Sequence, residues 1–224
     1  MFQNQGKAFV SWSGGKDSAF ACYIAIKNDK VKVAYLLNML SENGTHSRSH
    51  HLSVAVLRSQ AEAMGIPIMQ RQAIWGDYEE EFKKALAVFK QEGAQAGVFG
   101  DIDVQEHRDW VERVCSESGL NAVLPLWQWS RESLMGEFIA CGFKAVIVAV
   151  KLECMGSEWL GRQLNAEFIR DIKRLPQLDL CGENGEYHTF VYDGPIFKAP
   201  VAFSVGEKMH TQTHSFLDIV LKER

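Results

Sequence analysis

The chain is 224 residues long, with 46% hydrophobic and 23% charged residues, a composition that is ordinary for a globular protein in water. This length fits one large domain, or a main domain with a smaller second one, and it can bury a substantial core. The formal net charge is -4, and the Lys and Arg residues are scattered along the chain, so the basic stripe of a nucleic-acid-binding protein is missing and such a partner is not expected.

The cysteines and the N-terminus indicate a cytoplasmic protein. The five cysteines are dispersed, with neither a C-x-x-C pair nor the spacing of a metal finger. Such a set is typical of the reducing cytoplasm. The segment 1–5 lacks the basic-then-apolar pattern of a signal peptide. No apolar run approaches the ~20 residues of a membrane span, so we expect no association with a membrane.

A phosphate-binding loop is predicted near the N-terminus. The apolar run 8–12 has the character of a strand, residues 19–27 have that of a helix, and residues 13–18, Ser-Gly-Gly-Lys-Asp-Ser, lie between them. Gly14 and Gly15 allow positive φ and leave no Cβ in the way of a polyanion. The N–H groups that open a helix lack partners within it and attract negative charge. This order of strand, glycine turn and helix indicates a phosphate site, although two glycines alone would indicate only a turn.

The side chains of the loop strengthen this interpretation. Lys16 brings a positive charge, and Ser13 and Ser18 bring hydroxyl donors. Asp17 would repel a phosphate unless a metal ion or a helix N-terminus compensates its charge, so we expect Mg²⁺ beside it. A Walker A loop is excluded because it needs four residues between its two glycines. The hexapeptide instead resembles the signature of the PP-loop ATP pyrophosphatases, which cleave ATP between the α and β phosphates.

The segments that follow alternate between strand and helix. From apolar density, periodicity and turn residues we predict strands at 31–37, 66–69, 96–99 and 122–124, and helices at 51–64, 78–92 and 104–117. This alternation indicates a parallel sheet with helices on both faces. Ligands of such sheets lie beyond the carboxyl ends of the strands, so we expect the loops 13–18, 38–49 and 100–105 to face one crevice.

The alternation of strand and helix is interrupted at Pro125–Trp129. A helix at 132–141, a strand at 145–150 and a glycine-richer tail follow. We therefore predict an ATP-binding α/β domain at residues 1–126 and a smaller C-terminal α+β domain at residues 127–224, which would bind the substrate.

Several sequence blocks resemble a narrower family. The string 181–190, Cys-Gly-Glu-Asn-Gly-Glu-Tyr-His-Thr-Phe, followed by Asp193-Gly194-Pro195, is similar to the C-terminal signature of the diphthine-ammonia ligases, a family of PP-loop proteins. Further similar blocks are Ser41-Glu42-Asn43, His50, Gln60-Ala61, Pro125-Leu126-Trp127 and Trp159-Leu160-Gly161-Arg162. The resemblance covers most of the chain in family order, and it implies the Rossmann-like fold of the adenine nucleotide alpha hydrolases.

The chain departs from the diphthine-specific pattern in two places. It has Glu186-Tyr187-His188-Thr189 where those members carry Glu-Tyr-Glu-Thr, and Gly100–Asp103 followed by His107 where they carry a Gly-Ala block. Both variants resemble a bacterial branch of the family that has been linked to cobalamin metabolism. The resemblance therefore implies the chemistry of the family more firmly than its substrate.

The resemblance implies that a substrate carboxylate is adenylated, that pyrophosphate leaves, and that ammonia or an amine then displaces AMP. Such chemistry mainly requires the reactants to be aligned and the charge on the leaving group to be neutralised. The residues implied to bind ATP are Ser13, Gly14, Gly15, Lys16 and Ser18 at the phosphates, Asp17 at Mg²⁺, and Leu37, Asn38 and Met39 at the adenine. Lys16 and Asp17 are also expected to act in catalysis.

The acceptor side is predicted within residues 183–188. Glu183, Glu186 and His188 could bind ammonium or carry a proton, and Asn184 could contact the substrate. The alternative from the residues alone is a solvated polar turn without chemical function.

Two further groups are candidates for substrate contact. Asp101, Asp103 and His107 follow the fourth predicted strand and could bind a second metal or a cationic group. Equally, Asp103 could cap the following helix with His107 on its exposed face. Arg162, like Arg131, is a candidate clamp for a phosphate or a carboxylate.

We therefore expect an amide-forming ligase that uses ATP and Mg²⁺, with ammonia and a small-molecule or protein-borne carboxylate as its other substrates. A homodimer is compatible with the sequence. One rival is a PP-loop enzyme that modifies tRNA, but such enzymes usually have cysteine pairs and a basic face. Another is a non-catalytic module that senses ATP or AMP, which would have no need of the acidic C-terminal cluster.

Overall fold

A computed structural model of the chain describes residues 6–28 and 31–222. Segment 1–5, where the sequence shows no signal-peptide pattern, lies outside the described residues. Within the described part, no helix combines the length and the apolar character that crossing a bilayer requires. The chain divides into two compact units, each assembled from segments distant in sequence. The first unit comprises Met1–Ser13, Asp17–Thr45 and Gly65–Trp129, and the second comprises Gly14–Lys16, His46–Met64 and Ser130–Arg224.

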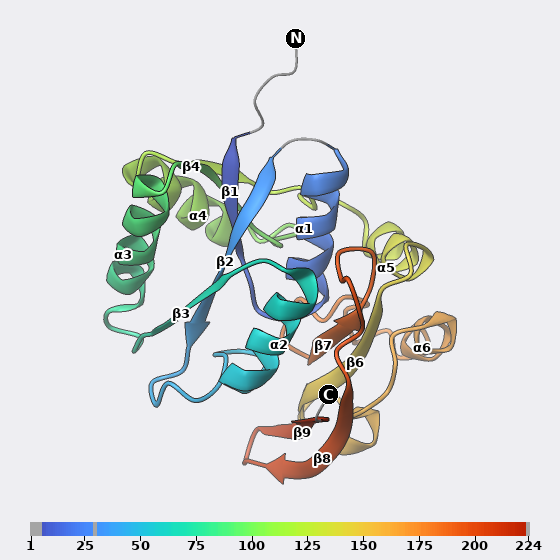
Figure 1. The fold of residues 1–224 in the computed structure, drawn as a ribbon. Helices are drawn as coiled ribbons and strands as arrows, with labels where there is room; N and C mark the ends of the chain where they lie inside the picture. The colour runs from blue at the N-terminus through green and yellow to red at the C-terminus, as the bar shows by residue number, and fades with distance from the viewer. Residues whose placement is uncertain (1–5, 29–30, 223–224) are drawn as a thin grey trace. The chain divides into compact units, whose positions relative to one another are not determined.

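A parallel five-stranded sheet forms the centre of the first unit, in the order β3-β2-β1-β4-β5 (Figure 1). Its strands are β1 (Lys7–Ser11), β2 (Lys32–Leu40), β3 (Ile68–Gln72), β4 (Ala94–Val98) and β5 (Asn121–Val123). The helices α1 (Lys16–Lys27), α3 (Tyr78–Gln91) and α4 (Gln105–Glu117) connect them. The predicted parallel sheet flanked by helices is confirmed, and the predicted elements are present with small shifts at their ends.

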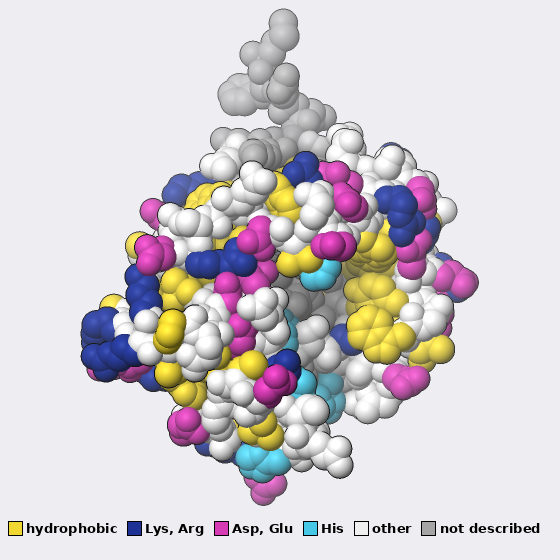
Figure 2. Space-filling view, turned by 180° about the vertical axis from the view of Figure 1, so that it is seen from behind, with side chains coloured by type: hydrophobic (Ala, Val, Ile, Leu, Met, Phe, Trp, Pro, Cys, Tyr) yellow, Lys and Arg dark blue, Asp and Glu magenta, His cyan; other side chains and the backbone are white. Residues whose placement is uncertain are grey.

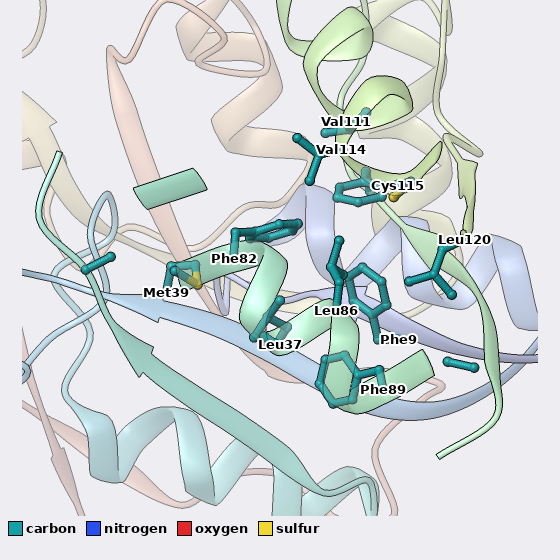
Figure 3. Close-up of a cluster of buried hydrophobic side chains, with 14 residues drawn as sticks. Phe9, Leu37, Met39, Phe82, Leu86, Phe89, Val111, Val114, Cys115 and Leu120 are labelled. Atoms are coloured by element: carbon teal, nitrogen blue, oxygen red, sulfur yellow. The ribbon is translucent and has the colours of Figure 1, made fainter. Parts of the chain in front are cut away.

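The core between the sheet and α3 and α4 explains why these segments fold as they do. Phe82, Leu86 and Phe89 of α3 are spaced along one face of the helix and are buried. They meet Phe9 of β1, whose ring centroid lies 5.4 Å from that of Phe89 (Figure 3). Burying such a side chain contributes about 1.5–3 kcal/mol. The packing fixes β1, and with it the point from which the loop 13–18 begins.

Strand β2 is longer than predicted, and this changes the setting of the proposed adenine site. It runs to Leu40 rather than to Leu37, because residues 38–40 pair with β3 and its last residues are buried. Strands β2, β1 and β4 are adjacent and parallel, so their carboxyl ends lie along one edge of the sheet. The first part of the predicted loop 38–49 is therefore strand.

The second unit contains an antiparallel sheet of order β7-β6-β9-β8. Its elements are α2 (Val54–Met64), α5 (Arg131–Ala140), β6 (Lys144–Lys151), the 3-10 turn η1 (Ser157–Trp159), α6 (Ala166–Ile172), β7 (Tyr187–Asp193), β8 (Phe203–His210) and β9 (His214–Leu221). The predicted C-terminal α+β class is confirmed. The prediction missed α6 and three strands in the tail. Of these, β8 is largely exposed and shows little apolar alternation.

Helix α2 begins later than the predicted 51–64. His51 has a φ of 55°, which a right-handed helix does not allow. His46 instead forms an antiparallel bridge with Ser53, so residues 46–53 close into a loop before the helix starts.

Candidate functional site

Residues 13–15 form the predicted glycine turn, but α1 begins at Lys16 rather than at residue 19, so residues 16–18 are its first turn. The two glycines are needed for different reasons. Gly14 has a φ of 84°, a conformation that favours glycine. A Cβ at Gly15 would overlap the ring of His50, so this position is required for space. Positive φ, which glycine allows at both positions, occurs at Gly14 and not at Gly15. The main chain of the loop is thus held in close contact with its surroundings.

In the first unit, the serines and Asn38 hold the ends of the loop. The hydroxyl oxygens of Ser13 and Ser18 lie 3.1 Å apart and share a hydrogen bond. Asn38 is buried, and its Nδ2 donates to the carbonyl of Trp12 at 2.8 Å. The side chains of Leu37 and Met39 belong to the hydrophobic core (Figure 3). Contact of these two residues with an adenine base would therefore have to come from their backbone atoms.

Two acidic residues, Asp17 and Asp101, influence each other in the first unit. Gly100 packs so closely on the backbone of Asp17 that a Cβ there would lie 2.8 Å from its carbonyl carbon, and this brings Asp101 near Asp17. Burial, opposed by the nearby His107 and aided by repulsion from Asp17, raises the pKa of Asp101. One carboxylate oxygen of Asp17 is hidden from solvent. Carboxylate oxygens are the donors that Mg²⁺ prefers, so Asp17, with Asp101 near it, fits this ion.

The other residues of the predicted acidic group are placed differently. Nδ1 of His107 lies 3.4 Å from Asp101, but the His107 side chain is 64% exposed. Asp103 is exposed and directly precedes Val104, the residue at the N-cap of α4. Within the described residues, no group of three or more His, Cys, Asp or Glu side chains is arranged to hold a metal.

In the second unit, β7 holds the start of α1. The backbone N–H of Lys16 donates to Oγ1 of Thr189 at 3.0 Å, and both residues are buried. The ammonium of Lys16 lies 5.6 Å from the centroid of the Tyr187 ring, a cation–π contact. Thr189 therefore caps the first backbone N–H of α1.

Gln60 and Val191 hold the carbonyl of Gly14. Val191 N–H donates to this oxygen at 3.0 Å, and Gln60 Nε2 donates to it at 2.9 Å and also to the carbonyl of Val191. Gln60 is completely buried. We refer to Gln60, Thr189 and Val191 as the loop clamp, because together they fix residues 14–16.

His50 packs beside the loop clamp in a defined tautomer. Its Nδ1 lies 2.8 Å from the carbonyl oxygen of Thr189, which can only accept, so Nδ1 carries a proton. Burial, opposed by this hydrogen bond and aided by the charge of Lys16, lowers the pKa of His50 to about 4. The ring centroids of His50 and His188 lie 4.8 Å apart. His50 is therefore neutral at pH 7.

The lowered pKa of His50 makes the stability of the protein depend on pH. Because an unfolded chain takes up this proton near pH 6.5, the contribution is fully present above that pH and is lost as the pH falls towards about 4. We expect the wild type to lose about 2 kcal/mol more unfolding free energy than His50→Asn between pH 7 and pH 5. Denaturant titrations at both pH values measure this difference, and equal losses in the two proteins would contradict the placement of His50.

A compact turn precedes β7 and contains the predicted acceptor residues. Glu186 is buried, and its carboxylate accepts hydrogen bonds from the N–H of Asp179, the N–H of Asn184 and Nδ2 of Asn184, each within 3.0 Å. Asp179 accepts from the N–H groups of Cys181 and Glu183 and pairs with Arg131 at 2.9 Å. Although burial opposes it, this set of partners lowers the pKa of Asp179. Glu186 and Asp179 thus shape the turn.

The remaining predicted residues in this unit have these positions. Glu183 and His188 are half-buried, and Asn184 is exposed. The guanidinium of Arg162 pairs with Asp171 and lies 4.5 Å from the ring centroid of Trp159. Arg131 is used by Asp179, so the charges of both candidate arginine clamps are already balanced within the unit.

Sequence reasoning assigned no role to Thr189 or Asp179. Thr189 and Lys16 are 173 residues apart, and no local pattern connects them. Gln60 and Thr189 belong to blocks that resemble the family, and this was the one signal that pointed to them.

Comparisons with known proteins agree with that resemblance. The profile named Diphthamide synthase N-terminal domain matches residues 6–122, and Diphthamide synthase C-terminal domain matches residues 130–223. Diphthine–ammonia ligase of Mus musculus is 28% identical, over 92% of this chain and 86% of that protein. The Danio rerio protein of that name is 29% identical, over 89% and 94%. A solved structure, described as a predicted subunit of tRNA methyltransferase from Methanocaldococcus jannaschii, shares 14% identity over 84% of this chain and 98% of its own. Its TM-score of 0.45 is too low to support a conclusion about this chain.

Proposed function

Because this chain belongs to the diphthamide synthase family, we propose that it is an ATP-dependent ligase that adenylates a substrate carboxylate and forms an amide with ammonia or an amine. The prediction of a ligase that forms carbon–nitrogen bonds is confirmed at the level of the family, whose curated members are diphthine–ammonia ligases. The observation that supports the ATP site is the glycine loop 13–18, which runs from the end of β1 into the first turn of α1, with Lys16 at the first position of the helix.

In this proposal the loop binds the phosphates of ATP. Lys16 and the N-terminus of α1 neutralise the charge that develops on the leaving pyrophosphate. A carboxylate oxygen of the acceptor attacks the α-phosphorus, and the bond to the bridging oxygen breaks, so that pyrophosphate leaves. The nitrogen nucleophile then attacks the acyl carbon, AMP leaves with the bonding electrons, and the nitrogen gives up a proton.

Asp17 would hold Mg²⁺ in this site, with Asp101 beside it. Their mutual repulsion, which contributes to the raised pKa of Asp101, is the kind of interaction that a divalent cation relieves. The ion would supply charge compensation for the phosphates. Lys16 is held by contacts within the protein, because its backbone N–H donates to Thr189 and its side chain is buried.

We assign the acceptor side to residues 183–188. Glu183 and His188 are half-buried rather than buried, so each could exchange a proton with a bound amine. Asp101, Asp103, His107 and Arg162 remain candidates for substrate contact. Since the chain carries His188 where diphthine-specific members carry Glu, we propose an acceptor carboxylate other than diphthine, either a small molecule or a group on a protein.

The products of ATP cleavage test the proposed function. The protein is incubated with ATP, Mg²⁺, ammonium and a panel of carboxylates, and the nucleotide products are separated by chromatography. We expect AMP and pyrophosphate in equal amounts with an acceptor present. ADP and phosphate would contradict adenylation, and ATP that binds without cleavage under every condition would favour the nucleotide sensor.

A further inference from the structure

Thr189 has a proton to donate that the described protein does not use. Its hydroxyl accepts the N–H of Lys16 at 3.0 Å, and the side chain is only 1% exposed. A hydroxyl that accepts one hydrogen bond can still donate one. Among residues 6–28 and 31–222, Oγ1 of Thr189 donates to no atom. A buried donor without an acceptor costs free energy, so such a group indicates a missing partner.

The surroundings of this hydroxyl favour an anion as that partner. Tyr187 and Thr189 are two residues apart in β7, so their side chains point to the same side of the strand. Both contact Lys16, one through the ammonium and the other through the backbone N–H at the start of α1. One side of β7 therefore has three groups that attract an anion: the Lys16 ammonium, the positive N-terminus of α1 and the hydroxyl proton of Thr189.

We propose that Thr189 is a phosphate-binding residue, which caps α1 through its oxygen and donates its proton to a phosphate oxygen of the bound nucleotide. This inference rests on the proposed function, because it assumes that the loop tip, residues 14–16, holds the phosphates of ATP. The loop clamp holds residues 14–16 by hydrogen bonds to β7, the strand that contains Thr189, and to Gln60. A nucleotide would therefore contact β7 as well as the glycine loop.

Variants at Thr189 separate this role from simple capping. Thr189→Val keeps the shape and removes the hydroxyl, Thr189→Ser keeps the hydroxyl, and Thr189→Ala removes the hydroxyl without placing a methyl group against the N–H of Lys16. Thr213→Val, at an exposed threonine before β9, is the matched control. Kd values for Mg-ATP and for adenosine are measured by calorimetry, with thermal denaturation of each variant. Thr189→Ala provides the comparison if Thr189→Val does not fold.

We expect Thr189→Val and Thr189→Ala to weaken Mg-ATP binding at least about tenfold, which is typical of a lost hydrogen bond to a charged group. Adenosine, which has no phosphate, should bind each variant as it binds the wild type, and Thr189→Ser and Thr213→Val should retain ATP affinity. Equal loss of ATP and adenosine affinity, or unchanged ATP affinity in both hydroxyl-free variants, would overturn the inference. A wild type that does not bind ATP would overturn the proposed function itself.

Discussion

Replacing Asp17 with Asn is expected to lower turnover on the order of 1000-fold while leaving the fold intact. The substitution keeps the size of the side chain and removes its charge. Asp17 lies in the first turn of α1, and the backbone of Gly100 packs against it. The neutral amide would bind a divalent cation beside the phosphates of ATP only weakly. Steady-state release of pyrophosphate measures the effect.

The control for this prediction is Asp109→Asn. Asp109 is an exposed acidic residue on α4 whose carboxylate accepts a hydrogen bond from Gln105. This variant should keep wild-type turnover, and both variants should unfold at nearly the wild-type temperature. Asp17→Asn with undiminished turnover would remove Asp17 from the metal role. Recovery of its activity at raised Mg²⁺ concentration would support that role, because a weakened site fills again at higher concentration.

The parts of the fold that could be predicted are those that local physics determines. Helix α3 was found from the spacing of Phe82, Leu86 and Phe89, which must share one face to reach the core. The loop 13–18 was found because a turn between strand and helix needs glycine, and because phosphate needs positive charge. Charges that are mixed along the sequence are also mixed on the face that Figure 2 shows, where Lys and Arg side chains lie among Asp and Glu side chains.

The parts that could not be predicted depend on contacts distant in sequence or on backbone strain. Thr189 caps Lys16 from 173 residues away, and no periodicity encodes that pair. His51 has the helical spacing of its neighbours, yet its φ of 55° delays α2 to Val54. Strand β8 is polar and largely exposed, so it has the composition of a loop. The candidate site is thus predictable at its glycine loop, whereas its supports from β7 are visible in the structure alone.

Glu186→Gln is expected to destabilise the protein by about 2–4 kcal/mol, because both carboxylate oxygens serve the turn 179–186. Oε1 accepts from the N–H of Asp179 and from Nδ2 of Asn184, and Oε2 accepts from the N–H of Asn184. An amide can keep an oxygen at only one of these two places. Its NH₂ group would then face a donor, and the remaining hydrogen bonds would lose their charge assistance.

The same variant distinguishes two roles for Glu186. If the carboxylate mainly shapes the turn, Glu186→Gln should lower the denaturation midpoint, and the affinity for Mg-ATP and the rate of product formation should fall together. If it carries a proton in the reaction, product formation should stop while the denaturation midpoint and ATP affinity stay at wild-type values. Three hydrogen bonds to a buried carboxylate favour the first outcome.

Glu183→Gln is the matched control for stability. Glu183 lies in the same turn and is half-buried, and its backbone N–H, which the substitution retains, donates to Asp179. We expect the unfolding free energy of this variant to stay within about 0.5 kcal/mol of the wild-type value. If proton transfer to the amine depends on Glu183, product formation should nevertheless fall. Loss of stability in Glu183→Gln as large as in Glu186→Gln would contradict this division, in which Glu186 builds the turn and Glu183 presents its carboxylate to the acceptor.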